Sequence, residues 1–313
     1  MNKSTKLKLM VKDFGILFTA KYFFLKKTGQ YEKYVKMVCD YLTSYLTDYI
    51  LDFNKEQHKN KEIIENNNIW VCWWQGEKYM PEFCRMCYQN LINNIPNEYS
   101  IHLVTRDNYR QYTDIPDFII YKMENGIIPI TQFSDILRQN LLLKNGGLWI
   151  DTSVWVTNDF LSKLDTNLPF WSVKLNAIDD PGVWGQLISN CKWGSFILYG
   201  ISGNEVFKFV YGAMCKYYKD HNSIIDYFLQ NIFIRIAYDN VDIIRKQIDD
   251  VKVSNENLYD LYRVIDDPYN EEIWNFYCEN TGFFKLTQKR EYIEYVDGKI
   301  TFYGYLKKMA YKK

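Results

Sequence analysis

The segment FSDILRQNLLLKNGGLWIDTSVWVT, residues Phe133 to Thr157, contains the pattern of a helix followed at once by the pattern of a strand. Asp135 and Arg138 lie three positions apart, and Gln139 lies four positions after Asp135. On a helix these three polar side chains project from one face, while the run Leu141 to Leu143 turns toward a core. The sequence therefore predicts a helix that presents an acid, a guanidinium and an amide to the same side.

Both ends of this helix carry recognisable signals. Thr131 or Ser134 is a residue type that caps a helix N-terminus, and the pair Gly146-Gly147 supplies the left-handed backbone that ends a helix. The apolar run Leu148 to Ile150 then predicts a short buried strand. Asp151 follows where the chain leaves the sheet, and ligands of open α/β sheets bind beyond the carboxyl ends of the strands.

The remainder of the central region alternates strand and helix patterns. Buried strands are predicted at 69–74, 99–105 and 170–173, and amphipathic helices at 205–219 and 224–238. This alternation is typical of an α/β protein with a Rossmann-like sheet. Asp226 lies at the start of the last helix, where a carboxylate is explained either by the helix dipole or by a functional role, the dipole being the commoner reason.

The motif Ser134-Asp135-x-Leu137-Arg138, followed by Gly146-Gly147-x-x-x-Asp151, resembles the sugar-binding region of glycosyltransferases that carry a DXD motif. More narrowly, it is similar to their capsular polysaccharide synthesis branch. Further segments match the same branch in the same order: IWVCWWQG at 69–76 with Pro81, IHLVT at 101–105 with Asn108-Tyr109 and Ile115-Pro116, and FKLTQK at 284–289. The matches span roughly residues 66 to 290, and their order and spacing make the resemblance specific.

The resemblance implies an α/β fold of the GT-A type, a Rossmann-like mixed sheet with flanking helices, preceded by an N-terminal helical segment. Together with the residue pattern and the charges, it divides the chain into three expected regions: a helical segment at 1–65, for which membrane association is one alternative, the glycosyltransferase domain at 66–290 and a basic tail packed on that domain at 291–313. The implied reaction moves a hexose from a UDP-linked donor to a lipid-linked oligosaccharide in bacterial surface polysaccharide assembly, with retention of configuration. The proton of the acceptor then passes to the diphosphate, so no carboxylate nucleophile is required.

The resemblance also implies roles for individual residues. Asp135 and Arg138 would hold the hydroxyls of the donor sugar, and Asp151 would contact the ribose or a metal. The other implied contacts are all to the donor nucleotide sugar, and they come from Trp70 beside the uracil, Trp74 and Gln75 at the neighbouring strand end, Ser134, Gly147, Ser153, and Lys285 and Lys289 at the diphosphate.

The chain departs from the family pattern at the DXD motif, which is Asp151-Thr152-Ser153 here. A divalent metal, Mn²⁺ or Mg²⁺, would be held by Asp151 and Ser153, but a serine hydroxyl is a much weaker ligand than a carboxylate. Metal dependence is therefore open at this point. Lys285 and Lys289 are expected to take over part of the work of a metal.

Each implied role has a simpler alternative. Asp135 and Arg138 can form an ordinary ion pair on an exposed helix, worth about 0.3–0.5 kcal/mol. Asp151 can be a turn residue, and Trp70 can belong to the core. At the level of function, the alternatives are a nucleotide-sugar binding protein that has lost catalysis, or a toxin-like glycosyltransferase that modifies a protein.

Composition is that of a globular protein, with 313 residues, 47% hydrophobic, 24% charged and no net charge. The chain has seven cysteines, and this odd number does not indicate a set of paired disulfides. A reducing compartment is therefore expected. Cys84 and Cys87 form a CxxC pair within a helix pattern, which favours packing over a zinc site. No signature of a nucleic-acid-binding protein is present, so no nucleic-acid partner is expected.

The charges are unevenly placed. Residues 1–36 hold nine lysines against Asp13 and Glu32, and residues 285–313 hold eight basic side chains against three acidic ones. The first segment alternates lysine with apolar residues and is too interrupted to span a bilayer. It either lies on an anionic membrane surface or packs on its own domain. The first alternative predicts a cytoplasmic protein that is peripheral at the inner face of the cell membrane.

Overall fold

The computed structural model describes residues 3–56, 66–177 and 184–312. Its centre is a five-stranded sheet in the order β2-β1-β3-β6-β5, and the strands are β1 (Asn68–Cys72), β2 (Ser100–Val104), β3 (Gly147–Ile150), β5 (Phe170–Ser172) and β6 (Ile197–Gly200). β1 pairs in parallel with β2 and β3, whereas β6 runs antiparallel to β3 and β5. The predicted α/β class with a mixed, Rossmann-like sheet is therefore confirmed, and the architecture is consistent with a GT-A type fold.

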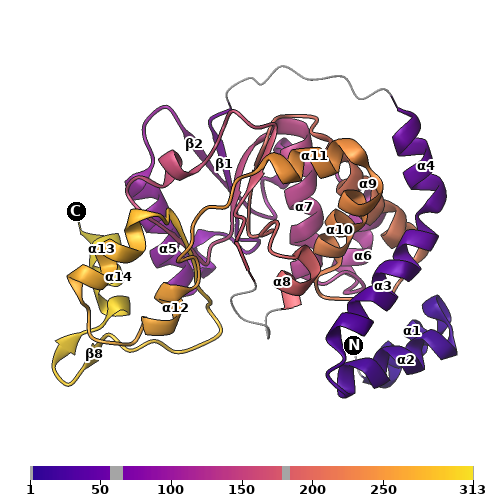
Figure 1. Ribbon diagram of the computed structural model, residues 1–313, viewed down its shortest axis with the longest axis horizontal. Helices are drawn as coiled ribbons and strands as arrows, with labels where there is room; N and C mark the ends of the chain where they lie inside the picture. The colour runs from indigo at the N-terminus through magenta and orange to yellow at the C-terminus, as the bar shows by residue number, and fades with distance from the viewer. Residues whose placement is uncertain (1–2, 57–65, 178–183, 313) are drawn as a thin grey trace.

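Helices cover both faces of the sheet, which explains why its central strands are apolar throughout. On one side lie α7 (Ile130–Asn145), α9 (Glu205–Asp220) and α10 (Leu229–Asn240), with α6 (Asp117–Glu124), α8 (Trp184–Ser189) and α11 (Asp242–Asp250) (Figure 1). On the other side lie α5 (Glu82–Asn94), α12 (Asp260–Val264), α13 (Glu271–Glu279) and α14 (Phe302–Tyr311) (Figure 1).

The remaining described elements of this region are short. They are the 3₁₀ turns η1 (Glu77–Tyr79), η2 (Tyr109–Gln111) and η3 (Phe160–Lys163), the pair β4 (Val154–Val156) and β7 (Phe283–Lys285), and the hairpin β8 (Tyr295–Val296) with β9 (Lys299–Ile300). The pair β4 and β7 is antiparallel, with Val154 opposite Lys285. This pairing brings the segment that follows Asp151 beside a part of the chain more than a hundred residues later.

The helix α7 differs from its prediction at one end. It begins at Ile130 after Pro129, and no side chain caps it, so the predicted caps Thr131 and Ser134 are wrong. Proline has a fixed φ and lacks an N–H, so it starts a helix without a polar cap. The predicted stop is confirmed: Gly146 and Gly147 have φ of 65° and 96°. A Cβ on Gly147 would lie 2.4 Å from the carbonyl oxygen of Asn68, so only glycine fits there.

The helix α10 also starts later than predicted, at Leu229 instead of Ile224. The residues before it form a loop because the carboxylate of Asp226 accepts a hydrogen bond from the backbone N–H of Phe228. The same carboxylate accepts a hydrogen bond from the hydroxyl of Tyr34 and lies 3.4 Å from the ammonium of Lys26. Asp226 therefore joins the N-terminal helices to the rest of the molecule and does not mark a helix start.

The N-terminal region is helical, as predicted, over its described residues. It consists of α1 (Lys3–Phe14), α2 (Ile16–Lys27), α3 (Tyr31–Tyr45) and α4 (Thr47–Lys55), which lie beside α9 and α10 in Figure 1. The face of α3 that packs on the rest of the molecule is fully buried, and it carries Tyr34, Val38 and Leu42. Most of the predicted linker, Asn54 to Asn68, falls in 57–65, outside the described residues.

The last described helix, α14, packs on α5, and the amide of Asn93 on α5 donates a hydrogen bond to the carbonyl oxygen of Ala310. Within the described ranges, no helix combines the length and the hydropathy needed to cross a bilayer.

Candidate active site

A cleft of about 530 Å³ opens beyond the carboxyl ends of β1 and β3. Its size lies within the range of ligand-binding pockets, roughly 300–1,000 Å³, and its position is where ligands bind in open α/β sheets. The predicted residues that line it are Trp74, Gln75, Ser134, Asp135, Arg138, Asp151, Ser153, Lys285 and Lys289. The structure thus gathers nine of the eleven predicted site residues in one cavity.

Arg138 is the centre of this cleft and is only 5% exposed. Its guanidinium lies 3.3 Å from a carboxylate oxygen of Asp135 and 3.1 Å from one of Asp151. It also donates a hydrogen bond to the side chain of Gln230 and lies 4.7 Å from the centre of the Trp149 ring. A planar guanidinium held on several sides in this way has little freedom left, so it holds both carboxylates in a defined geometry.

The pKa values of the two carboxyl groups are shifted in opposite directions. Burial is the main cause that raises the pKa of Asp135 to about 7, and the nearby Asp151 adds to it, although Arg138 opposes them. Burial also acts to raise the pKa of Asp151, but Lys285, Arg138 and the indole of Trp149 outweigh it, so that pKa is lowered. Two carboxyl groups with separated pKa values are suited to different tasks at one site.

Lys285 reaches the cleft from β7. Its ammonium lies 3.3 Å from a carboxylate oxygen of Asp151 and donates a hydrogen bond of 2.6 Å to the hydroxyl of Ser153. It also lies 4.9 Å from the centre of the Phe196 ring. The positive charge is therefore held between the two residues that correspond to the ends of the DXD motif.

This arrangement does not fit a divalent metal. The oxygens of Asp151 and Ser153, which would be its ligands, are already bound by the ammonium of Lys285. No cluster of three or more His, Cys, Asp or Glu able to hold a metal occurs in the described part of the chain. Mn²⁺ and Mg²⁺ need several oxygen ligands, preferably carboxylates. The residues present supply a fixed organic cation at this place instead.

The other walls of the cleft are aromatic or basic. The Trp74 ring lies 5.1 Å from that of Tyr109 and 4.9 Å from that of Phe133, at the end of β1. Elsewhere in the lining, the ammonium of Lys289 lies 5.8 Å from the centre of the Tyr227 ring. The cleft thus combines a planar apolar surface near β1 with two lysines near β7.

Two predicted donor contacts, Trp70 and Gly147, lie elsewhere. Trp70 is 2% exposed, its indole N–H donates to the carbonyl oxygen of Gly146, and its ring is stacked on His102. Gly147 is buried at the start of β3, the opposite end of the strand from Asp151. Neither residue lines the cleft: Trp70 is packed against its neighbours, and Gly147 is a buried backbone position with no room for a side chain. The prediction that they contact a ligand is therefore corrected.

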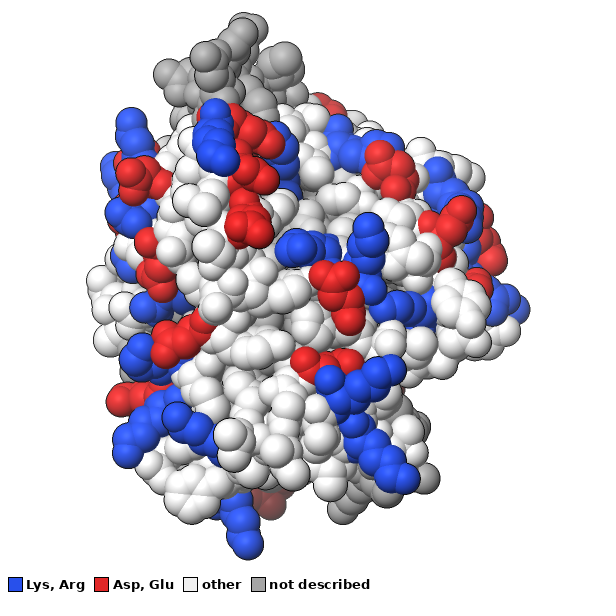
Figure 2. All heavy atoms as spheres, turned by 90° about the vertical axis from the view of Figure 1, so that its right-hand side faces the viewer, with Lys and Arg blue, Asp and Glu red and all other residues white. Residues whose placement is uncertain are grey.

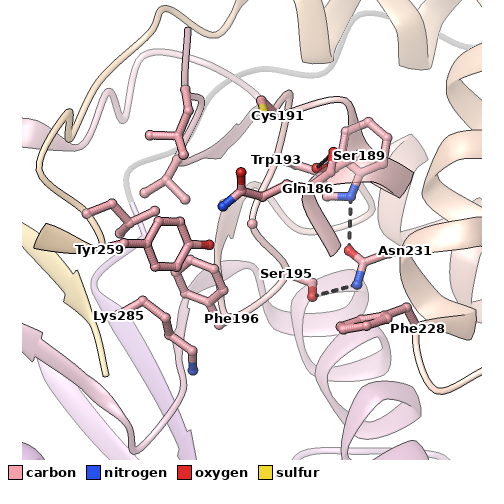
Figure 3. Close-up of a pocket in the computed structure, with 14 residues that line it drawn as sticks. Gln186, Ser189, Cys191, Trp193, Ser195, Phe196, Phe228, Asn231, Tyr259 and Lys285 are labelled. Atoms are coloured by element: carbon pink, nitrogen blue, oxygen red, sulfur yellow. Dashed lines mark hydrogen bonds between the residues drawn. The ribbon is translucent and has the colours of Figure 1, made fainter. Parts of the chain in front are cut away.

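Residues that sequence patterns did not indicate complete the cleft. Phe196 precedes β6, Tyr227 precedes α10, and Asn231 lies in the first turn of α10. The amide of Asn231 accepts a hydrogen bond from the indole of Trp193 and donates one to the hydroxyl of Ser195 (Figure 3). Two of these residues lie in separate loops and Asn231 lies on α10, so only the packing of β6 and α10 brings them together.

Comparison with known proteins agrees with the resemblance seen in the motifs. A search of the curated proteins finds no match. The family model described as capsular polysaccharide synthesis protein matches residues 19–306, which include every predicted site residue. The chain therefore belongs to the capsular polysaccharide synthesis protein family.

Proposed function

We propose that the protein is a glycosyltransferase that moves a hexose from a UDP-linked donor to a lipid-linked oligosaccharide in bacterial capsular polysaccharide synthesis. The observation that carries this proposal is the buried Arg138, joined to Asp135 and Asp151 in a cleft where Lys285 supplies a fixed positive charge. Carboxylates and a guanidinium bind sugar hydroxyls, and an ammonium binds phosphate, so the cleft has the parts that a nucleotide sugar requires.

The chemistry of transfer follows from these parts. The bond between the sugar and the diphosphate breaks through a transition state in which negative charge grows on the departing diphosphate. Lys285 and Lys289 stabilise that charge, because cations that are already in place need no reorganisation as the charge develops. Asp135 and Arg138 orient the sugar through its hydroxyls, and Trp74 with Gln75 forms the surface for the uracil.

Retention of configuration requires that the acceptor hydroxyl attack from the face of the leaving diphosphate. In that geometry a diphosphate oxygen takes the proton of the acceptor, and no covalent intermediate with the protein forms. Asp151 is unsuited to be a nucleophile, since Arg138 and Lys285 hold both of its oxygens. Its role is to position these two cations for the donor.

A donor screen tests the proposal. Thermal shift and sugar release are measured with a set of UDP- and GDP-sugars, in EDTA and in Mn²⁺. We expect at least one UDP-sugar to stabilise the protein and to be hydrolysed slowly, with the same rate in EDTA because Lys285 stands where a metal would bind. Stabilisation without release or transfer for any donor would instead favour a binding protein that has lost catalysis. Absence of any nucleotide-sugar binding would refute the proposal.

We also propose that α2 attaches the protein to an anionic membrane at the inner face of the cell. Thr19, Tyr22 and Leu25 form the face of α2 that is buried against the molecule. The opposite face carries Ile16, Leu17 and Phe24, which are 70%, 84% and 59% exposed. One face of the helix is therefore docked on its own chain, while the other is apolar and open.

The charges around the exposed apolar face of α2 indicate which kind of surface it binds. Lys21 and Lys27 on α2 are exposed, and Figure 2 shows basic side chains, with acidic ones among them, around uncharged surface on the side of the molecule that carries the N-terminal helices. The acid of α1, Asp13, accepts hydrogen bonds from the backbone of Asn222 and Ser223. Apolar side chains flanked by lysines bind the headgroup region of anionic bilayers.

Replacement of Leu17 and Phe24 by Gln is expected to lower binding to phosphatidylglycerol-containing vesicles by about a hundred-fold or more, since each of the two buried side chains contributes roughly 1.5–3 kcal/mol. Vesicle sedimentation measures the effect. The matched control is Phe276→Gln, because Phe276 on α13 is similarly exposed but lies far from α2. Equal binding of the double variant and the wild type, or equal binding to neutral vesicles, would contradict the proposal.

A further inference from the structure

A second cavity of about 190 Å³ adjoins the cleft on its β5 and β6 side. Five residues line both spaces, and they are Ser195, Phe196, Phe228, Asn231 and Lys285. Figure 3 shows Tyr259, Phe196 and Lys285 on one side of the cavity and Trp193, Asn231 and Phe228 on the other. The two spaces therefore meet at Lys285, the residue that we place at the diphosphate.

The second cavity differs from the cleft in its chemistry. Its walls are mostly apolar, with Val173, Leu175 and Leu258 completing the four aromatic residues Trp193, Phe196, Phe228 and Tyr259. Asn231 lies among them, but its amide is already bound to Trp193 and Ser195. Lys285 is the charged residue of this lining, and it stands at the junction with the cleft. Gln186, Ser189 and Ser195 add polar side chains to the lining, so the interior offers mainly rings and methyl groups with a few polar groups among them.

Size and position separate this cavity from the nucleotide. It is smaller than the roughly 300 Å³ at which pockets for whole drug-sized ligands begin. The aromatic surface for a base, Trp74, lies at the end of β1, and β3 separates β1 from β6 in the sheet. A nucleotide sugar that reaches from Trp74 to Lys285 therefore leaves the second cavity free. Transfer requires that the attacking hydroxyl stand beside the diphosphate, and this cavity opens there.

We propose that this cavity receives the terminal sugar of the acceptor, and that this sugar carries a methyl group as a 2-acetamido or 6-deoxy substituent. The inference rests on the proposed function. The C–H face of a sugar packs on aromatic rings. A hydroxyl buried against the apolar walls would lack a partner, which is unfavourable, whereas the methyl end of either substituent loses nothing at the same place.

The test measures binding of methyl glycosides to the full-length protein by saturation-transfer NMR in the presence of UDP. The probes are the methyl glycosides of N-acetylglucosamine, N-acetylgalactosamine and rhamnose, with methyl glucoside for comparison. We expect transfer to the acetamido or deoxy methyl protons of at least one probe and little transfer to methyl glucoside. Methyl glucoside as the strongest binder, or no binding of any probe, would overturn the proposal.

Two variants locate the binding. Leu175→Trp fills the cavity, and Tyr259→Ala removes part of its wall. Both variants are therefore expected to bind the methyl glycoside about ten-fold more weakly, or weaker still. UDP affinity should stay within about two-fold of the wild type, because the variants do not reach the cleft. Tyr262→Ala is the matched control, since Tyr262 lies in the same segment but outside the cavity.

The outcomes separate the two proposals. Normal methyl glycoside binding in both variants overturns the assignment of the cavity, even when UDP-sugar hydrolysis is intact. A parallel loss of UDP and glycoside affinity in folded variants also overturns it, because the cavity would then belong to the donor. Failure of the wild type to bind any nucleotide sugar would refute the proposed function itself, whatever the glycosides do.

Discussion

Asp135→Asn lowers turnover by about two to three orders of magnitude, the loss typical of removing one preorganised polar group from a transition state. In the proposed complex this carboxylate would accept hydrogen bonds from the donor sugar, and an amide can accept with only one atom. Because burial raises the pKa of Asp135 to about 7, the wild-type rate should also fall as pH drops below neutrality, when the carboxyl group takes up a proton. Steady-state rates across this pH range measure both effects.

The same substitution has an opposite effect on stability. A carboxyl group whose pKa is raised in the folded state stabilises the fold at low pH, and this contribution is lost as pH rises through the folded value. Between about pH 5 and pH 8 the wild type should therefore lose about 2–3 kcal/mol relative to Asp135→Asn. Chemical denaturation at both pH values gives this difference. Normal turnover of Asp135→Asn would contradict the role given to this carboxylate. So would a variant that is less stable than the wild type at the higher pH.

A matched control is available at Asp114. It lies outside the cleft, bound to Asn140 and Lys144, and these bonds lower its pKa. Asp114→Asn should leave turnover unchanged. Its effect on the pH dependence of stability is opposite to that of Asp135→Asn. A carboxyl group whose pKa is lowered in the folded state stabilises the fold at neutral pH, and this contribution is lost as pH falls through the folded pKa.

Lys285→Met is expected to lower turnover by about three orders of magnitude, since it removes the fixed charge at the departing diphosphate. The pKa of Asp151 should rise at the same time, because Lys285 is a main cause of its lowering. Single-turnover rates measure the first effect. Lys163→Met is the control, as Lys163 pairs with Asp159 outside the cleft.

A second variant tests whether Lys285 stands in for a metal. Lys285→Ala combined with Ser153→Asp recreates two carboxylates at the motif and frees the space between them. We expect this double variant to regain part of its activity only when Mn²⁺ is added, whereas the wild type is insensitive to EDTA. Loss of wild-type activity in EDTA would contradict the hypothesis that the ammonium of Lys285 replaces a metal ion. A double variant whose activity does not change on addition of Mn²⁺ would contradict it as well.

Much of the central unit could be predicted from residue pattern because its signals are local. The helix that carries Asp135 and Arg138, the glycine pair that ends it and the apolar strand before Asp151 depend on neighbours within a few positions. Spacing alone brings Asp135 and Arg138 to one face. The residue type at Ser153 likewise predicts a weakened metal site, since a hydroxyl is a poorer ligand than a carboxylate.

Other features depend on contacts between distant parts of the chain. Lys285 meets Asp151 across 134 positions, through the pairing of β4 and β7, so no local pattern gives the distance between them. Trp70 is a residue type that can stack on a base, yet in the structure it belongs to the core, because its ring is buried and stacked on His102. The second cavity is lined by residues after β5, on α8, before β6, at the start of α10, before α12 and on β7, and only the packing of these elements creates it. Periodicity specifies which face of a helix or strand is polar, whereas the partner that this face meets is selected by how the layers pack.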